Sequence, residues 1–226
     1  MGNIVNAKEN LYNFVEKLRW NYGINSYPIN IANIYKSNEP TELIFYNFKT
    51  PGFCGAALPG EKSNTIILNS NRTVDELNFD CGHEVIHLTK HKNQNNDIFT
   101  CFERSQNKFL EWEANEGSAE LLLPYRLFLP ILKENWSTFY SFTDIYRFKR
   151  KIAKEFHIPI SVVENRIENL KYETHQFLNG KNLNDLEILS NNQQKNRNII
   201  IQSLNDIETI DLMKQVKNMT ANRQCS

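Results

Sequence analysis

The motif His83-Glu84-Val85-Ile86-His87 constrains this chain more than any other feature, because it lies in a segment with helical spacing. Residues four apart share one face of a helix, so the imidazoles of His83 and His87 can bind one metal ion. Glu84 follows the first histidine, and its carboxylate can reach a metal-bound water. Two histidine ligands and a general base are the parts of a zinc metalloprotease. The alternative is a helix that carries two partly exposed histidines and no metal.

A catalytic zinc ion usually has three protein ligands and one water, so the motif requires a third ligand. Two acids, Glu111 and Glu113, lie near the start of a second helical pattern at residues 109–124. Glu111 and Asn115 are four apart and share a face, whereas Glu113 points elsewhere. Asn115 can accept a hydrogen bond from the far ring nitrogen of a zinc-bound histidine. We therefore expect Glu111 to be the third ligand and Glu113 to be a solvated acid near the helix start.

Three runs of residues around these positions are similar to the two helices that carry the metal site in a known peptidase family. They are Asn78-Phe79-Asp80-Cys81-Gly82-His83-Glu84-Val85-Ile86-His87, Glu111-x-x-Ala114-Asn115 and Leu121-Leu122-Leu123-Pro124. The chain thereby resembles the ImmA/IrrE metallopeptidases, whose helices read close to FTLAHELGHLLLH and ExxANxFAxxLLMP. The resemblance covers about residues 8–170.

The resemblance implies an α+β, zincin-like fold with a small antiparallel or mixed sheet, followed by a helical C-terminal region. It implies one Zn²⁺ per chain, with His83, His87 and Glu111 as ligands and Glu84 as the general base. Asn115 would orient a ligand. The implied substrate is a protein, a helix-turn-helix repressor of bacterial or phage origin that is cleaved at one site.

Two positions depart from the family pattern. Val85-Ile86 replaces the usual Leu-Gly, and Gly117-Ser118 replaces a step that contains an aromatic residue. Neither change affects a ligand, but we expect both to reshape the substrate cleft.

Residues 42–48, 53–58 and 65–69 are predicted strands, since they are rich in β-branched, aromatic or small residues between turn signals. Zinc proteases of this broad class bind substrate as a strand added to a sheet edge. Small side chains in the second strand would let another backbone approach. One hypothesis is therefore that substrate pairs with this strand, and an ordinary packed strand is an equal alternative. The small residues are Cys54, Gly55, Ala56 and Ala57.

Helical spacing and capping signals predict helices at residues 8–22, from Pro28 to Tyr35, and from a Thr73/Glu76 capping box to about His91. We expect His91 to be an exposed histidine at the helix end, with a role near the substrate or the ligands as the alternative. We divide the chain into a metallopeptidase domain at 1–135, a helix-turn-helix-like region at 136–178, and a polar linker with a terminal helix at 179–226.

The charge balance argues against a protein built for nucleic-acid binding, because Lys and Arg number 26, as do Asp and Glu. The first helix of the helix-turn-helix-like pair carries basic residues that can meet phosphates. The second carries Glu164 and Glu168 beside Arg166, which is poor for reading a DNA groove. We favour packing or protein docking over DNA contact.

The four cysteines form no C-x-x-C pair and fit a reducing compartment. We expect Cys81 to have a packing role, with a cysteine switch on the zinc as the alternative. The N-terminus lacks the apolar core of a signal peptide, and no apolar run approaches the roughly 18 residues that span a membrane. We therefore expect a cytoplasmic protein without a membrane partner.

Two classes of function fit these features. The first is a zinc endopeptidase in which Glu84 activates the attacking water. The second is a non-proteolytic zinc-binding regulator or toxin-antitoxin protein that acts by binding a partner or DNA. The intact Glu84 argues against the second class, because a structural zinc site needs no base.

Overall fold

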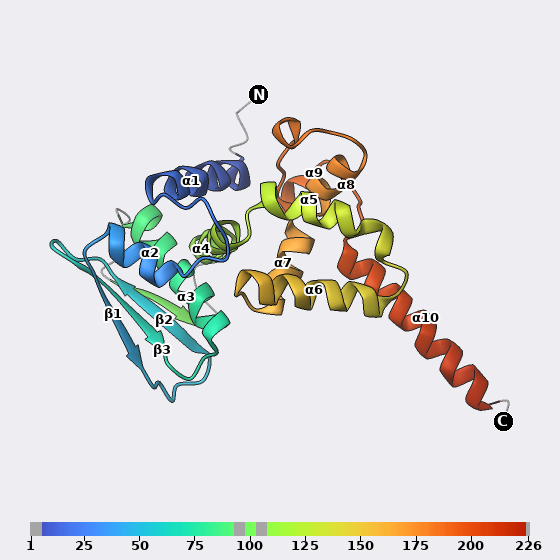
Figure 1. The fold of residues 1–226 in the computed structure, drawn as a ribbon, viewed down its shortest axis with the longest axis horizontal. Helices are drawn as coiled ribbons and strands as arrows, with labels where there is room; N and C mark the ends of the chain where they lie inside the picture. The colour runs from blue at the N-terminus through green and yellow to red at the C-terminus, as the bar shows by residue number, and fades with distance from the viewer. Residues whose placement is uncertain (1–5, 93–97, 103–107, 225–226) are drawn as a thin grey trace. The chain divides into compact units, whose positions relative to one another are not determined.

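The computed structural model describes residues 6–92, 98–102 and 108–224 of the chain. The fold is α+β, as predicted, with a small mixed sheet and many helices (Figure 1). Two compact units are present. The first, here called the sheet unit, contains Asn10–Pro124 and Glu155–Pro159. The second, the helical unit, contains Tyr125–Lys154 and Ile160–Ser226 with the N-terminal residues up to Glu9. The functional boundaries expected at residues 135 and 178 stay predictions.

The sheet has four described strands in the order β1-β3-β2-β4, with β1 and β3 parallel and the other neighbours antiparallel. The three predicted strands are confirmed to within a few residues, and β4 is an addition. In β3, Ile66 and Leu68 are buried whereas Ile67 is only partly buried, so one face of the sheet is packed. The strands are β1 (Thr41–Tyr46), β2 (Phe53–Leu58), β3 (Asn64–Asn69) and β4 (Phe99–Phe102).

Strand β2 is an interior strand. Gly55 pairs with Leu68 of β3 on one side and with Cys101 of β4 on the other. Both rows of its backbone groups are therefore used within the sheet, and no further strand can pair with it. The hypothesis that substrate adds along β2 is wrong for this reason. The residues expected to lie beside the substrate were Cys54, Gly55, Ala56 and Ala57.

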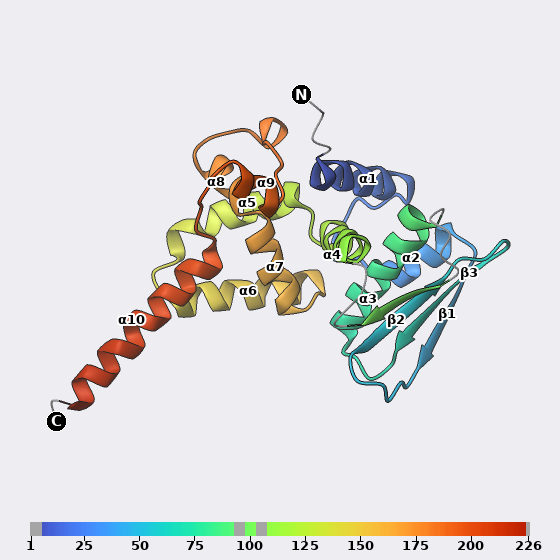
Figure 2. The same cartoon turned by 180° about the vertical axis from the view of Figure 1, so that it is seen from behind.

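Helices cover one face of the sheet, with α3 packed against β2, β3 and α4 (Figures 1 and 2). The predicted capping box is confirmed, because the Thr73 side chain accepts from the Glu76 backbone and Glu76 bonds back to Thr73. Helix α2 starts later than predicted, since Asn30 is its cap. The helices of this unit are α1 (Ala7–Asn21), α2 (Ile31–Asn38), α3 (Val74–Ile86), the π-helical turn η1 (His87–His91) and α4 (Lys108–Leu122).

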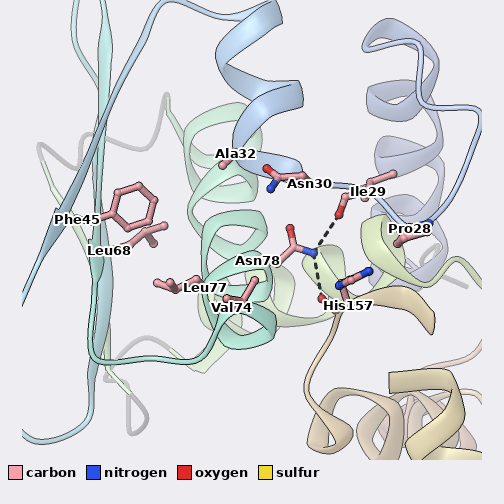
Figure 3. A pocket seen from close by; sticks show the side chains of 10 residues that line it. All are labelled: Pro28, Ile29, Asn30, Ala32, Phe45, Leu68, Val74, Leu77, Asn78 and His157. Carbon is pink, nitrogen blue, oxygen red and sulfur yellow. Dashed lines mark hydrogen bonds between the residues drawn. The ribbon is translucent and has the colours of Figure 1, made fainter. Parts of the chain in front are cut away.

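The side chain of Asn78 joins three segments of the sheet unit (Figure 3). Its amide nitrogen donates to the backbone oxygens of Ile29 and His157, and its oxygen accepts from the backbone of Ile31. These bonds hold the start of α2 and the turn at His157 against α3. Beside Asn78 lies a hollow of about 440 Å³. Its walls are mainly apolar and include Phe45, Leu68, Val74 and Leu77 (Figure 3).

The helical unit extends through residues 179–197, which we expected to be a linker. Leu186, Ile188 and Leu189 are buried there, and Ser190 forms a capping box at the start of α9. The segment is therefore packed, and the predicted terminal helix follows it as α10. The helices are α5 (Tyr125–Asn135), α6 (Phe142–Phe156), α7 (Ile160–Asn169), α8 (Lys171–Leu178), α9 (Asn191–Asn196), α10 (Leu204–Gln224) and the short turns η2 (Trp136–Thr138) and η3 (Leu183–Asp185).

No helix in the described part of the chain combines the length and the apolar character that a bilayer crossing requires.

A buried ion pair stabilises the helical unit. The Lys8 ammonium lies 2.8 Å from Glu173, and it also donates to the backbone oxygens of Asn169 and Leu189. The side chains of Lys8 and Glu173 are 2% and 0% exposed. Removal of one member of such a pair leaves an uncompensated buried charge.

We expect Lys8→Met to lower the free energy of unfolding by about 3–5 kcal/mol, because Glu173 loses its cation inside the protein. Urea denaturation followed by circular dichroism measures the change. Lys171→Met is the matched control, since Lys171 pairs with Glu168 where both side chains are partly exposed, and pairs that water can reach contribute about 0–1 kcal/mol. Equal losses in both variants would contradict the argument.

Candidate metal centre

The three predicted ligands converge at the end of α3 and the start of α4. The Nε2 atoms of His83 and His87 lie 3.0 Å apart. The carboxylate of Glu111 lies 3.2 Å from Nε2 of His83 and 3.4 Å from Nε2 of His87. Donor atoms around a tetrahedral zinc ion are separated by about 3.3 Å, given metal–ligand distances near 2.0–2.1 Å. The donor set therefore fits a metal ion of this size and geometry.

The protonation states of these groups favour metal binding. Burial lowers the pKa of His87, so its ring is neutral and keeps a lone pair. Burial opposes the ionisation of Glu111, but its interactions with the rings of His83 and His87 outweigh it and lower its pKa to about 2. Metal ligands must be deprotonated, and His87 and Glu111 meet this condition near neutral pH.

Asn115 lies where the spacing of α4 predicts. Its Oδ1 is 3.0 Å from Nδ1 of His83, on the ring side away from the other ligands. An amide oxygen only accepts, so His83 carries its proton on Nδ1 and directs the lone pair of Nε2 toward Glu111. Asn115 thus sets the tautomer and the orientation of that ring.

Glu84 is a buried carboxylate without a hydrogen-bond partner among the described residues. Its side chain is fully buried, and both carboxylate oxygens lack a partner there. Burial first, and then the charges of Glu111 and Asp80, raise its pKa well above the usual range. Gly55 of β2 makes room, since a Cβ there would lie 3.2 Å from Glu84 Oε1. A buried carboxyl group that has no protein partner and a raised pKa is suited to exchange protons with a bound molecule.

Two sequence predictions in this region are wrong. His91 is not an exposed residue at the helix end but is fully buried, with Nδ1 2.9 Å from Nδ1 of His87. Glu113 is not solvated but is 4% exposed and lies 3.0 Å from Nε2 of His91. The face of Glu113 does differ from that of Glu111, but it packs on η1. The spacing of His91, four residues after His87, indicates that the two rings are close. Nothing in the sequence of α4 indicates that Glu113 contacts His91.

The two departures from the family pattern face each other between α3 and α4. A Cβ at Gly117 would lie 3.1 Å from Cδ1 of Ile86, and a Cβ at Gly82 would lie 2.5 Å from Oγ of Ser118. The bulky Ile86 is thus accommodated by the missing side chain at Gly117. The substitutions compensate each other, and the helices keep a close approach.

Two histidines, a carboxylate and a buried unpaired glutamate, on adjacent helices beneath a small mixed sheet, are the features of a metallopeptidase site. The family model Peptidase_M78, described as an IrrE N-terminal-like domain, matches residues 41–168. This is more than half of the chain, and the chain belongs to that family. The resemblance to the ImmA/IrrE metallopeptidases is confirmed. Family membership supports a metallopeptidase with a bound metal. None of the curated proteins compared with the chain matches it.

The Ile86–Gly117 contact can be measured by a double-mutant cycle. We expect Gly117→Val to cost about 1–3 kcal/mol through overpacking, and Ile86→Ala to cost about 2–5 kcal/mol. In the double variant the loss should be smaller than the sum by about 0.5–3 kcal/mol. Chemical denaturation gives all four values.

The control cycle combines Gly117→Val with Ile66→Ala, a buried position in β3. These two changes should add to within about 0.5 kcal/mol. Additivity in the Ile86 cycle as well would show that Ile86 and Gly117 do not compensate each other.

Proposed function

We propose that this protein is a zinc-dependent endopeptidase that cleaves a bacterial or phage transcriptional repressor. The observation that carries the proposal is the convergence of His83, His87 and Glu111 beside the buried, unpaired carboxylate of Glu84. A site for structural zinc alone needs no such carboxylate. Two imidazole nitrogens and one carboxylate oxygen, with a position left for a further ligand, favour zinc over harder cations.

When bound, zinc supplies Lewis acidity, which polarises a peptide carbonyl and lowers the pKa of water to about 7. The residues of the chain do the rest. Glu84 takes the proton of the attacking water and passes it to the leaving amine. Its raised pKa makes it a strong enough base to hold that proton during the reaction. Asn115 keeps the ring of His83 oriented throughout.

Strand β4 offers the place for an extended substrate, in contrast to β2. It is an edge strand among those described. Its residue Phe99 stacks on the ring of His87, with ring centroids 4.7 Å apart. A peptide added along β4 through backbone hydrogen bonds would therefore run beside the metal centre. The repressor as the particular substrate follows from the family resemblance.

The rival class, a non-proteolytic regulator that binds DNA or a partner, loses two cations of the helix-turn-helix-like pair to packing, although Arg147, Arg150, Lys151 and Lys154 of α6 are exposed. Arg166 of α7 is fully buried. Lys149 of α6 is buried too, and it pairs with Glu164 and Glu208. These two cations serve the packing of the helical unit and are not presented to phosphates.

We expect Glu84→Gln to keep the metal but to lower the cleavage rate by about 10²–10⁴-fold, because the general base is lost. His87→Ala is the matched variant, which should lose the metal and the activity together. Metal content by mass spectrometry and cleavage of candidate helix-turn-helix repressors, including any that is encoded beside the gene, measure the two effects. Undiminished cleavage by Glu84→Gln would refute the mechanism. A metal-loaded wild type that cleaves no candidate repressor would favour the regulator.

A further inference from the structure

His87 is the first residue of a buried chain of hydrogen bonds that ends on a carboxylate. Its Nδ1 lies 2.9 Å from Nδ1 of His91, and Nε2 of His91 lies 3.0 Å from Oε2 of Glu113. The other carboxylate oxygen of Glu113 lies 3.0 Å from the ammonium of Lys90. His87 and His91 are the first and last residues of η1, and π-helical turns of this kind often lie at functional sites.

The end groups determine the direction of every bond in this chain. The Lys90 ammonium can only donate, and it lies 3.0 Å from one oxygen of Glu113, so the carboxylate of Glu113 is the acceptor at this end of the chain. Nε2 of His91 must then donate, and its Nδ1 is the acceptor in the tautomer that carries a single ring proton. Nδ1 of His87 consequently donates, and the lone pair of its Nε2 points toward His83 and Glu111.

The two histidines of the motif are therefore supported differently. His83 donates to the neutral amide of Asn115, whereas His87 donates through a second imidazole to an anion. An anion at the end of such a chain increases the electron density on the ligating nitrogen and fixes the plane of the ring. Phe99 stacks on the same ring with an interplanar angle of 17° and blocks rotation from the side.

We propose that His91 and Glu113 are positioning residues for the metal, which hold His87 in the tautomer and orientation that a metal ligand needs. The proposal rests on the proposed zinc site. Neither residue belongs to the converging donors His83, His87 and Glu111. His91 acts through His87, and Glu113 acts through His91. The pair does for His87 what Asn115 does for His83, with the added effect of a negative charge.

Zinc affinity of the full chain tests the proposal, measured by competition with a chromophoric chelator. His91→Phe fills the space but offers no acceptor to His87, and we expect the dissociation constant to rise about 10–100-fold. Glu113→Gln keeps an acceptor and loses the charge, and we expect a rise near the lower end of that range, about 10-fold. The visible spectrum of the Co²⁺-loaded protein should shift in both variants, because the ligand field of His87 changes.

Leu88→Ala is the matched control, because Leu88 is a buried residue of the same turn whose side chain has no hydrogen-bonding atom. It should lower the melting temperature but leave the zinc affinity and the Co²⁺ spectrum unchanged. If His91→Phe does not fold, Glu113→Gln carries the test alone.

Wild-type zinc affinity in His91→Phe or Glu113→Gln would overturn the proposal. An equal loss of zinc affinity in Leu88→Ala would also overturn it, because it would show that His91 and Glu113 contribute only packing. These results would leave the zinc site itself intact. A wild-type chain that binds no zinc would overturn the proposed site and the positioning role together.

Discussion

The metal centre depends on the close approach of helices α3 and α4. His83, Glu84 and the start of η1 belong to one helix, and Glu111 belongs to the other, so the ligands meet only if the two axes are near. Gly82 and Gly117 permit this, since a Cβ at either position would press into Ser118 or Ile86. The helices are thus held by steric fit between small and large side chains. The distances from Glu111 to His83 and His87 follow from that fit.

The centre is also surrounded by buried polar groups whose partners come from both helices. Asn115 orients His83, and His91 with Glu113 orients His87. Such a network is stable only when each member is satisfied, because an unpaired buried polar group costs free energy. Glu84 is an exception within the metal centre, with two oxygens that no described protein group satisfies. The exception lies where a substrate and a metal would supply the missing interactions.

Sequence reasoning recovered what depends on local spacing. The position of Glu111 beside the two histidines, the contact of Asn115 with His83 and the capping box all follow from spacing along a helix or from the family resemblance. The misses depend on tertiary contacts. His91 and Glu113 lie on different helices, and nothing in either segment shows that they meet. The small residues in β2 suggest space for a substrate backbone, but β2 is an interior strand. The missing side chain at Gly55 instead leaves space for the Glu84 carboxylate.

Under the proposed function, the position of β4 at the edge of the described sheet has a consequence for the shape of the substrate. A polypeptide that pairs with a four-residue edge must present an extended stretch whose own backbone groups are free. Helices and paired strands do not meet that condition, whereas a tether between two folded domains does. Backbone pairing discriminates little between side chains, so the accessibility of the tether would govern which bond is cut. A repressor that keeps its tether packed would resist cleavage until a conformational change exposes it.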